Sequence, residues 1–198
     1  MSRYVMILIA ALAMAASAAA QAGNWQIDPA HSSAQFSVRH LGVSTVRGAF
    51  MKVSGSAKYD AADPSKGSLD ATIEATSVDT RVEMRDNDLR SPNFLDVAKY
   101  PTITFHSKQT KAAGAGKLQI TGDLTIHGVT KAVTFAVEGP SAPGKDPWGN
   151  TRIGLSATAK INRKDFGLVW NATLETGGFL VGDEIQIALD VQFIKAAQ

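Results

Sequence analysis

The stretch IQIALDVQF, Ile185 to Phe193, decides the fold of this chain. Every second residue in it is large and apolar: Ile185, Ile187, Leu189, Val191 and Phe193. A period of two is typical of a β-strand with one buried face, because successive side chains of a strand point to opposite sides. The stretch therefore predicts a strand whose apolar face lies against a core.

The same alternation recurs along most of the chain from Ser32 onward. Its apolar positions are Ala34, Phe36 and Val38; Leu69, Ala71, Ile73 and Ala75; Leu118, Ile120, Leu124 and Ile126; Val133, Phe135 and Val137; and Ile153, Leu155, Ala157, Ala159 and Ile161. Gly122 interrupts one set and predicts a bulge or tight bend there.

Turn-forming residues separate these segments. They lie at 60–67, 112–116, 127–128, 139–149 and 176–182. Connections this short favour antiparallel pairing, since a parallel return needs a crossover of about a dozen residues or more. The sequence therefore predicts an all-β fold of about seven to nine antiparallel strands, a closed barrel or a sandwich.

One segment between two strands does not alternate. Thr80 and Glu83 have the spacing of a capping box, in which a hydroxyl and a carboxylate satisfy the first backbone donors of a helix. Asp86 and Arg90 have the spacing and order of a helix surface pair. We predict a short helix over residues 81–90, followed by an irregular stretch up to the next strand. This insertion is expected to cover an opening of the sheet system.

The first twenty residues have the composition of a secretory signal peptide. Arg3 gives a positive start, an apolar run follows from Val5 to Ala16, and small residues precede position 21. The run is shorter than the roughly 20 apolar residues of a membrane-spanning helix. We expect cleavage after Ala20 or Ala22, export to the periplasm, and one domain over residues 21–198 without a membrane span.

Composition excludes several classes of protein. The formal net charge is +2 and both signs are scattered along the chain, so no basic face for nucleic acid or for an anionic membrane is expected. The absence of cysteine excludes disulfides, thiol catalysis and thiolate metal sites. No two histidines have a local ligand spacing such as H-x-x-x-H, so we predict no metal site and no cofactor; the four are His31, His40, His106 and His127.

The sequence also lacks the usual marks of a hydrolase. G-x-S-x-G is absent, and the nearest string, at 54–56, lies within an alternating segment and not at a strand-to-helix turn. Asp96, Asp165 and Asp183 are isolated carboxylates of the kind that cap turns. Because no set of nucleophile, base and oxyanion donor can be assembled, we expect no enzyme.

A few polar and aromatic residues are candidates for the rim of a barrel. The polar candidates, which suit a ligand's polar head at one mouth, are His31, Arg39, His40 and Arg47. We favour a structural role for them, because the arginines fit outward positions or pairing with Asp28 and Asp96 equally well. Trp148 and Trp170 stand beside turn signals, where they would flank a pocket or simply pack at the rim.

Several longer motifs resemble the YceI family, a family of exported bacterial proteins. They are WQIDPAHSSAQFSVRHLGVSTVRGAF at 25–50, LRSPNFLDVAKYPTITF at 89–105, LTIHGVTKAVTF at 124–135, INRKDFGLVW at 161–170 and VGDEIQI at 181–187. The resemblance implies a lipocalin-like barrel of eight antiparallel strands that holds a long apolar molecule of the polyisoprenoid or fatty-acyl type. A barrel of about eight strands can fill itself with side chains or hold one small ligand. The resemblance favours the ligand.

The inward apolar residues are the predicted ligand-binding residues. They are Phe36, Val38, Ile73, Ile103, Phe105, Leu118, Ile120, Phe135, Leu155, Ile187 and Leu189. Small inward residues such as Ala34, Ala71 and Ala157 leave volume for a ligand, although they also fit the taper of a packed barrel. The alternative function is a ligand-free interaction or stress-response module on a packed barrel, and a lipid-modifying enzyme comes third. The sequence leaves open the ligand's head group, the physiological process and the oligomeric state, a homodimer included.

Overall fold

The computed structural model describes residues 23–175 and 177–196, so the predicted signal peptide and its cleavage sites lie outside the described residues. Its strands are β1 (Gly23–Ile27), β2 (Ser33–His40), β3 (Ser44–Phe50), β4 (Val53–Tyr59), β5 (Ser68–Glu74), β6 (Val78–Asp79), β7 (Thr102–Ala112), β8 (Lys117–Ile126), β9 (Val129–Glu138), β10 (Gly144–Lys145), β11 (Thr151–Asn162) and β12 (Val181–Lys195). The one α-helix of the described residues is α1 (Glu83–Arg90), and short 3-10 turns are η1 (Pro29–His31), η2 (Pro64–Lys66), η3 (Ala75–Ser77) and η4 (Arg163–Phe166).

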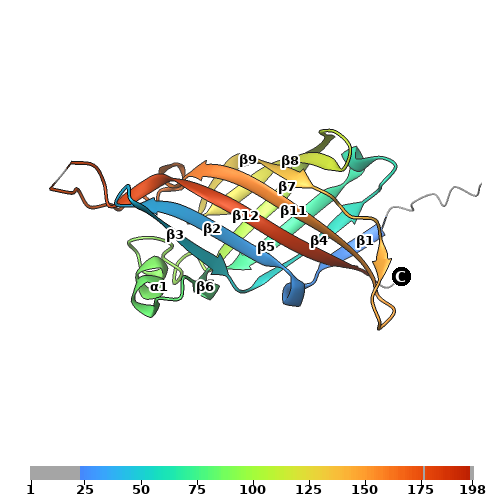
Figure 1. Cartoon of the computed structure of the whole chain (residues 1–198), viewed down its shortest axis with the longest axis horizontal. Helices are drawn as coiled ribbons and strands as arrows, with labels where there is room; N and C mark the ends of the chain where they lie inside the picture. Colours follow the sequence, from blue (N-terminus) through green and yellow to red (C-terminus); the bar gives the residue numbers. More distant parts are fainter. Residues whose placement is uncertain (1–22, 176, 197–198) are drawn as a thin grey trace, which may run out of the picture.

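Eight of these strands close an antiparallel barrel. Their hydrogen-bonded order is β1, β4, β5, β7, β8, β9, β11 and β12, and β12 returns to β1. The barrel is elongated, with its strands inclined to the long axis (Figure 1). The predicted fold class, an antiparallel barrel of about eight strands with one short helix, is confirmed.

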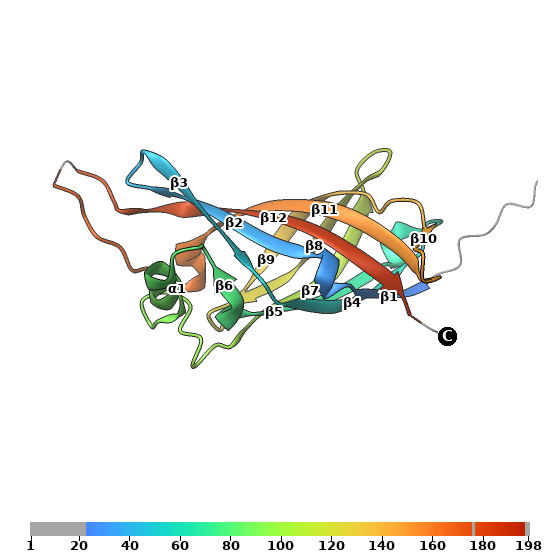
Figure 2. The ribbon, with the colours of Figure 1, turned by 60° about the horizontal axis from the view of Figure 1, so that its bottom comes forward.

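β12, the strand that contains residues 185–193, pairs with three other strands of the sheet. One edge of β12 pairs with β11 from Glu184 to Ile194. The other edge is shared, because β2 pairs with its first part and β1 with residues 193–195. As a result β2, β3 and β6 leave the ring at one end and extend the wall there, beside α1 (Figures 1 and 2).

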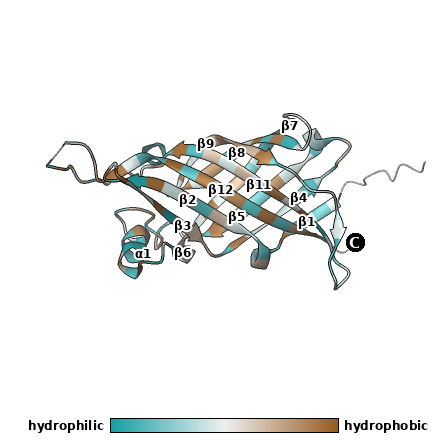
Figure 3. Ribbon diagram, viewed as in Figure 1, coloured by the Kyte–Doolittle hydropathy of each residue, from teal (hydrophilic) through white to brown (hydrophobic). Residues whose placement is uncertain are grey.

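Apolar side chains of alternating positions fill or line the barrel, and the ribbon accordingly changes between apolar and polar along each strand (Figure 3). A larger cluster is centred on β7, β8 and β9 and includes Phe105, Phe135 and Phe166. A smaller cluster closes the end opposite α1; its buried members are Trp25, Ile27, Ala34, Val53, Ile153 and Phe193. No helix of the described residues is long and apolar enough to cross a membrane.

The predicted capping box is wrong. The helix begins at Glu83, its N-cap residue is Val82, and no side chain caps it. Thr80 instead donates from its backbone N–H and its hydroxyl to Oδ1 of Asp86, at 2.8 and 2.5 Å. Thr80 and Asp86 are both buried, so each needs a polar partner within the protein, and they supply it to one another.

The predicted surface pair of Asp86 and Arg90 is also wrong, because Asp86 faces inward to Thr80. Arg90 donates to the carbonyl oxygens of Thr76 and Val78, at 2.9 and 2.6 Å. This arginine therefore ties α1 to the chain segment that precedes it.

The bulge expected at Gly122 lies on the partner strand. Ser107 pairs with Gly122 and Gln109 pairs with Thr121, so Lys108 is the extra residue, in β7. A Cβ on Gly122 would lie 2.3 Å from the carbonyl oxygen of His106, so glycine permits the close approach of the bulged strand. The extra residue reverses the side-chain phase of β7 beyond it.

Candidate functional site: an apolar cavity in the barrel

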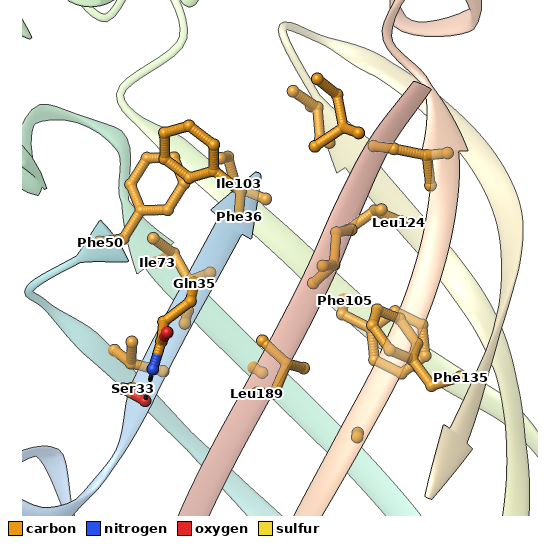
Figure 4. A pocket seen from close by; sticks show the side chains of 18 of the residues that line it. Ser33, Gln35, Phe36, Phe50, Ile73, Ile103, Phe105, Leu124, Phe135 and Leu189 are labelled. Carbon is orange, nitrogen blue, oxygen red and sulfur yellow. Dashed lines mark hydrogen bonds between the residues drawn. The ribbon is translucent and has the colours of Figure 1, made fainter. Parts of the chain in front are cut away.

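A cavity of about 230 Å³ lies inside the barrel, between the smaller apolar cluster and α1 (Figure 4). Its apolar lining comes from all eight strands of the ring, from β2, β3 and β6, and from the segments around α1. Only four lining residues of the described chain are polar: Ser33, Gln35, Thr104 and Arg163. The interior therefore offers a ligand apolar contacts and almost no hydrogen bonds.

Ten of the eleven predicted ligand-binding residues line this cavity. They are Phe36, Val38, Ile73, Ile103, Phe105, Ile120, Phe135, Leu155, Ile187 and Leu189. Leu118 does not, because it lies near the start of β8, next to the β7–β8 turn, where it is buried against its cross-strand neighbour Val137. The structure thus places the predicted set around one space, while their role in binding stays a prediction.

The wall formed by β12 and β2 is only half-buried on its inner side. Ile185, Ile187 and Leu189 line the cavity and keep intermediate exposure, while the residues between them on the outer side are exposed. Phe36 and Val38 of β2 are likewise intermediate. An inward side chain in a solid core would be buried, so this exposure is the surface of the cavity itself.

The wall formed by β7, β8 and β9 is packed. Phe105 and Phe135 meet edge to face with their ring centroids 5.1 Å apart. A Cβ on Gly122 would lie 2.6 Å from Cζ of Phe105, so the phenyl ring occupies the space that a side chain on β8 would need. Ile120 and Leu124, which flank this glycine on the same face, are buried.

The end of the cavity near α1 is built from two chain segments outside the ring of strands. Leu89 of α1 and Phe94 and Leu95 after it line the cavity on one side, and Leu168 lines it on the other. The rings of Phe94 and Trp170 are 5.2 Å apart and join the two segments. Trp170 thus lies behind the cavity lining, whereas Trp148 is 79% exposed on the turn between β10 and β11.

Arg163, the charged residue of the lining, has every N–H occupied. Its guanidinium donates to the carbonyl oxygens of Leu168, Trp170, Val181 and Gly182 and to Oδ1 of Asp183. Burial lowers the pKa of Arg163, and the nearby carboxylate of Asp183 opposes this shift. Arg163 therefore holds the chain between η4 and β12 in place and leaves no donor for a ligand.

Sequence reasoning did not single out Arg163. The available signal was weak: an arginine directly after the alternating segment of β11, within a run that also contains Lys164 and Asp165. Its burial depends on a loop that returns to it over the next twenty positions, which no local pattern shows.

The residues proposed to hold a polar head group do not line the apolar cavity. Arg39 donates to Oγ1 of Thr45 at 3.0 Å and to the carbonyl oxygen of Gly42 at 2.6 Å, so it braces the hairpin between β2 and β3. The suggested pairing of Arg39 or Arg47 with Asp28 or Asp96 is absent among the described residues, where Asp28 binds Arg152 and His31 instead. These contacts fit a structural role for Arg39 and His31, whereas for His40 and Arg47 that role stays a prediction.

Asp28 belongs to a charge network at the opposite end of the barrel. Hydrogen bonds from Arg152 and then from His31 lower the pKa of Asp28 to about 2. Arg152 also donates from Nε to Oδ2 of Asp146 at 2.6 Å. Burial by itself would raise the pKa of Asp146, but hydrogen bonds from Asn150 and Arg152 lower it to about 2. This network ties η1 to the turn before β11.

The histidines are dispersed over the molecule. His106 pairs with Asp70 on the outer face at 2.7 Å, and the ring of His127 lies 4.5 Å from that of Tyr100 at the turn between β8 and β9. Across residues 23–175 and 177–196, no three histidine or acidic side chains converge as metal ligands would.

Comparison with known proteins identifies the family. Residues 25–193 match the YceI-like domain. A UPF0312 protein of Vibrio cholerae is 38% identical over 170 residues, which cover 85% of this chain and 89% of the relative. Among solved structures, BcnA of Burkholderia cenocepacia is similar with a TM-score of 0.72, 28% identity, and coverage of 84% of this chain and 98% of BcnA.

A polyisoprenoid-binding domain from Saccharophagus degradans, implicated in plant cell wall breakdown, has a TM-score of 0.62 at 16% identity. The alignment covers 87% of this chain and 98% of that domain. At this level of identity the similarity concerns the fold alone. From the domain match and the relatives together, this chain belongs to the YceI-like family.

Proposed function

We propose that this protein binds one long apolar molecule, of the polyisoprenoid or fatty-acyl type, inside the barrel, and carries or sequesters it in the periplasm. The observation that carries the proposal is the half-buried inner face of β12 and β2 around an apolar cavity. Water in such a space finds few hydrogen-bond partners, so an apolar chain replaces it favourably. The affinity would come from apolar contact, at roughly 25 cal/mol per Å² removed from water.

The similar proteins support this choice of ligand class. The fold is shared with the polyisoprenoid-binding domain of Saccharophagus degradans, whose name states an apolar chain as its ligand. The cavity of the present chain suits the same chemistry, since its lining is apolar from Ile27 at one end to Leu89 at the other. Arg163, the single charge in the lining, is saturated by internal hydrogen bonds.

The lining favours binding over catalysis. Among the described residues that line the cavity there is no histidine, lysine, aspartate or glutamate. A general base must lie within hydrogen-bond reach of the proton that it removes, and the lining offers none. We therefore propose a carrier that leaves its ligand chemically unchanged.

The test compares two neighbouring positions of β12 with the same new side chain. Ile187→Asn places an amide in the cavity, whereas Ala188→Asn places it on the exposed outer face. We expect Ile187→Asn to weaken binding of a fluorescent prenyl or fatty-acyl probe by tenfold or more, because an amide without partners is costly to bury against a hydrocarbon. Ala188→Asn should bind like the parent protein.

The comparison is made on variants that retain cooperative unfolding. Equal binding by both folded variants would place the ligand outside the cavity, or would mean that the barrel is a ligand-free scaffold. An organic extract of protein from its native host, analysed by mass spectrometry, would identify the bound molecule.

A further inference from the structure

Large exposed apolar side chains are concentrated at one end of the molecule. Of the eight found in the described residues, six lie on the three segments that surround the α1 end of the cavity: Leu41, Val43, Val82, Met84, Val169 and Phe179. The other two are Met51 on the β3–β4 turn and Trp148 at the opposite end. These segments are the hairpin of β2 and β3, α1 with Val82 before it, and the described chain between η4 and β12, residue 176 apart; all lie at this end (Figures 1 and 2).

The tip of the β2–β3 hairpin, residues 41–43, is one of these apolar segments. Val43 is 78% exposed, and Leu41 is exposed with a left-handed φ of 55°. That backbone conformation favours glycine or asparagine, so a leucine there is an unusual choice for a solvated turn. The N–H of Leu41 donates to the carbonyl oxygen of Leu180 at 2.8 Å, which sets the tip beside exposed Phe179.

The scattered charge of the whole chain predicts no basic face for an anionic membrane, but this hairpin by itself carries only positive charge. From Ser33 to Phe50 it contains Arg39 and Arg47 and no carboxylate. Within the described chain no carboxylate forms an ion pair with either arginine. The neighbouring acids of β12 are matched elsewhere, Asp183 by Lys164 at 2.8 Å and Glu184 by Lys160 at 3.1 Å. Two further carboxylates belong to neighbouring segments: Glu175 in the loop before β12, and Asp79 of β6, which pairs with Ala49 at the end of β3 away from the tip.

The cavity lining continues outward to this tip. Val38 lines the cavity and pairs with Val46 and with Ile185, only three residues before Leu41. Val181 also lines the cavity and pairs with His40 at the base of the tip. The outer face of the hairpin, in contrast, carries Arg39 and Arg47. The hairpin thus has an apolar tip joined to the cavity and a basic outer face.

We propose that the tip of the β2–β3 hairpin docks the α1 end of the barrel on the surface of an anionic phospholipid bilayer. Leu41 and Val43 enter the boundary between head groups and acyl chains, and Arg39 and Arg47 contact the phosphates. Apolar side chains on a protruding element together with basic residues beside them are the two features that bind proteins to such surfaces. Charge complementarity selects a bilayer over a second copy, whose equivalent hairpin would also be positive. The proposal does not depend on which molecule fills the cavity.

The test measures flotation of the protein with vesicles of phosphatidylcholine and with vesicles that also contain phosphatidylglycerol. The two matched variants are Val43→Asp at the tip and Trp148→Asp at the opposite end, where the side chains are 78% and 79% exposed. We expect Val43→Asp to reduce partitioning to the anionic vesicles by tenfold or more, because the variant loses an inserted apolar side chain and gains a repelled charge. Arg47→Gln should reduce it about fivefold. Trp148→Asp should leave it unchanged.

Several results would overturn the proposal. Partitioning that is equal for Val43→Asp and the parent, or equal on neutral and anionic vesicles, contradicts docking by this hairpin. A parent protein that is dimeric by light scattering and becomes monomeric in Val43→Asp, without a vesicle effect, assigns the tip to self-association instead. Binding of the soluble probe in the absence of vesicles should be the same in Val43→Asp and the parent, which separates a failure of docking from a failure of the cavity.

Discussion

The two sides of the barrel follow one sequence pattern and are packed differently. On the β7–β9 side the inward residues are buried, among them Phe105, Leu124 and Val137. On the β12–β2 side the inward residues are half-buried and face the cavity, among them Val38 and Leu189. Alternation therefore tells which way a side chain points, and the size and contacts of its neighbours decide whether a ligand has room.

The difference has a local cause. Gly122 lets β7 and the ring of Phe105 approach β8, and Phe135 closes on that ring from β9. On the other side β12 carries only aliphatic inward side chains from Ile185 to Val191, and the rings of Phe36 and Phe50 lie 5.7 Å apart on β2 and β3. An aromatic residue buries about 150–250 Å², so the rings of Phe105 and Phe135 fill the interior beside Gly122, while no ring of β12 fills the space along that strand.

The largest expected effect comes from truncating one residue on each side. Phe105→Ala should lower the free energy of unfolding by about 3–5 kcal/mol, because it opens a new void in a packed region. Leu189→Ala should cost roughly 1–2 kcal/mol, since part of that side chain already faces a cavity. Urea unfolding of the ligand-free protein measures both. Equal losses would mean that the two sides are packed alike.

A smaller effect is expected from adding one methyl group to a glycine. Gly122→Ala should destabilise the protein by about 1–3 kcal/mol, because its Cβ would meet the carbonyl oxygen of His106 and the ring of Phe105. Gly154→Ala in β11 is the control, as the nearest atom to its Cβ is 3.7 Å away. It should be neutral or slightly stabilising. Similar thermal unfolding temperatures for the two variants would show that Gly122 is not the cause of the tight packing on the β7–β9 side.

The smallest expected effect concerns the charge network at the closed end. The pKa of Asp28 is lowered from 3.8 to about 2 in the folded protein, so the carboxylate stabilises the fold at pH values above 3.8. This contribution should be lost as the pH falls from 3.8 toward 2. Unfolding free energies measured over that range should fall less steeply for Asp28→Asn than for the parent. An unchanged slope would show that the network does not contribute to acid stability.

The sequence predicted the parts of the fold that repeat locally. Alternation located most barrel strands, and turn-forming residues located the connections, including His127 and Gly128, which both have positive φ. It did not predict β1, where only Trp25 and Ile27 alternate before Pro29. The helix was located within two residues at its start, but its internal contacts were wrong because they depend on which side of it is buried.

The sequence predicted which residues point inward, but not which of them border a cavity. Leu118 and Leu189 have the same pattern around them, yet only Leu189 borders the cavity. The volume of the cavity depends on contacts between residues that are far apart in the sequence, such as Phe94 and Trp170. Arg163 was missed for the same reason, since its partners come from the returning loop.

The most direct test of the difference in packing between the two sides of the barrel enlarges one valine on each side. Both Val38 and Val137 line the cavity, but Val38 is half-buried on β2 and Val137 is 3% exposed on β9. For each valine-to-phenylalanine variant, the thermal stability of the ligand-free protein and its affinity for the fluorescent probe are measured together. We expect Val38→Phe to keep or gain stability and to lose probe binding, because the ring occupies the cavity, whereas Val137→Phe should be destabilised by about 1–3 kcal/mol. Equal destabilisation by both variants, with probe binding retained in Val38→Phe, would contradict this expectation.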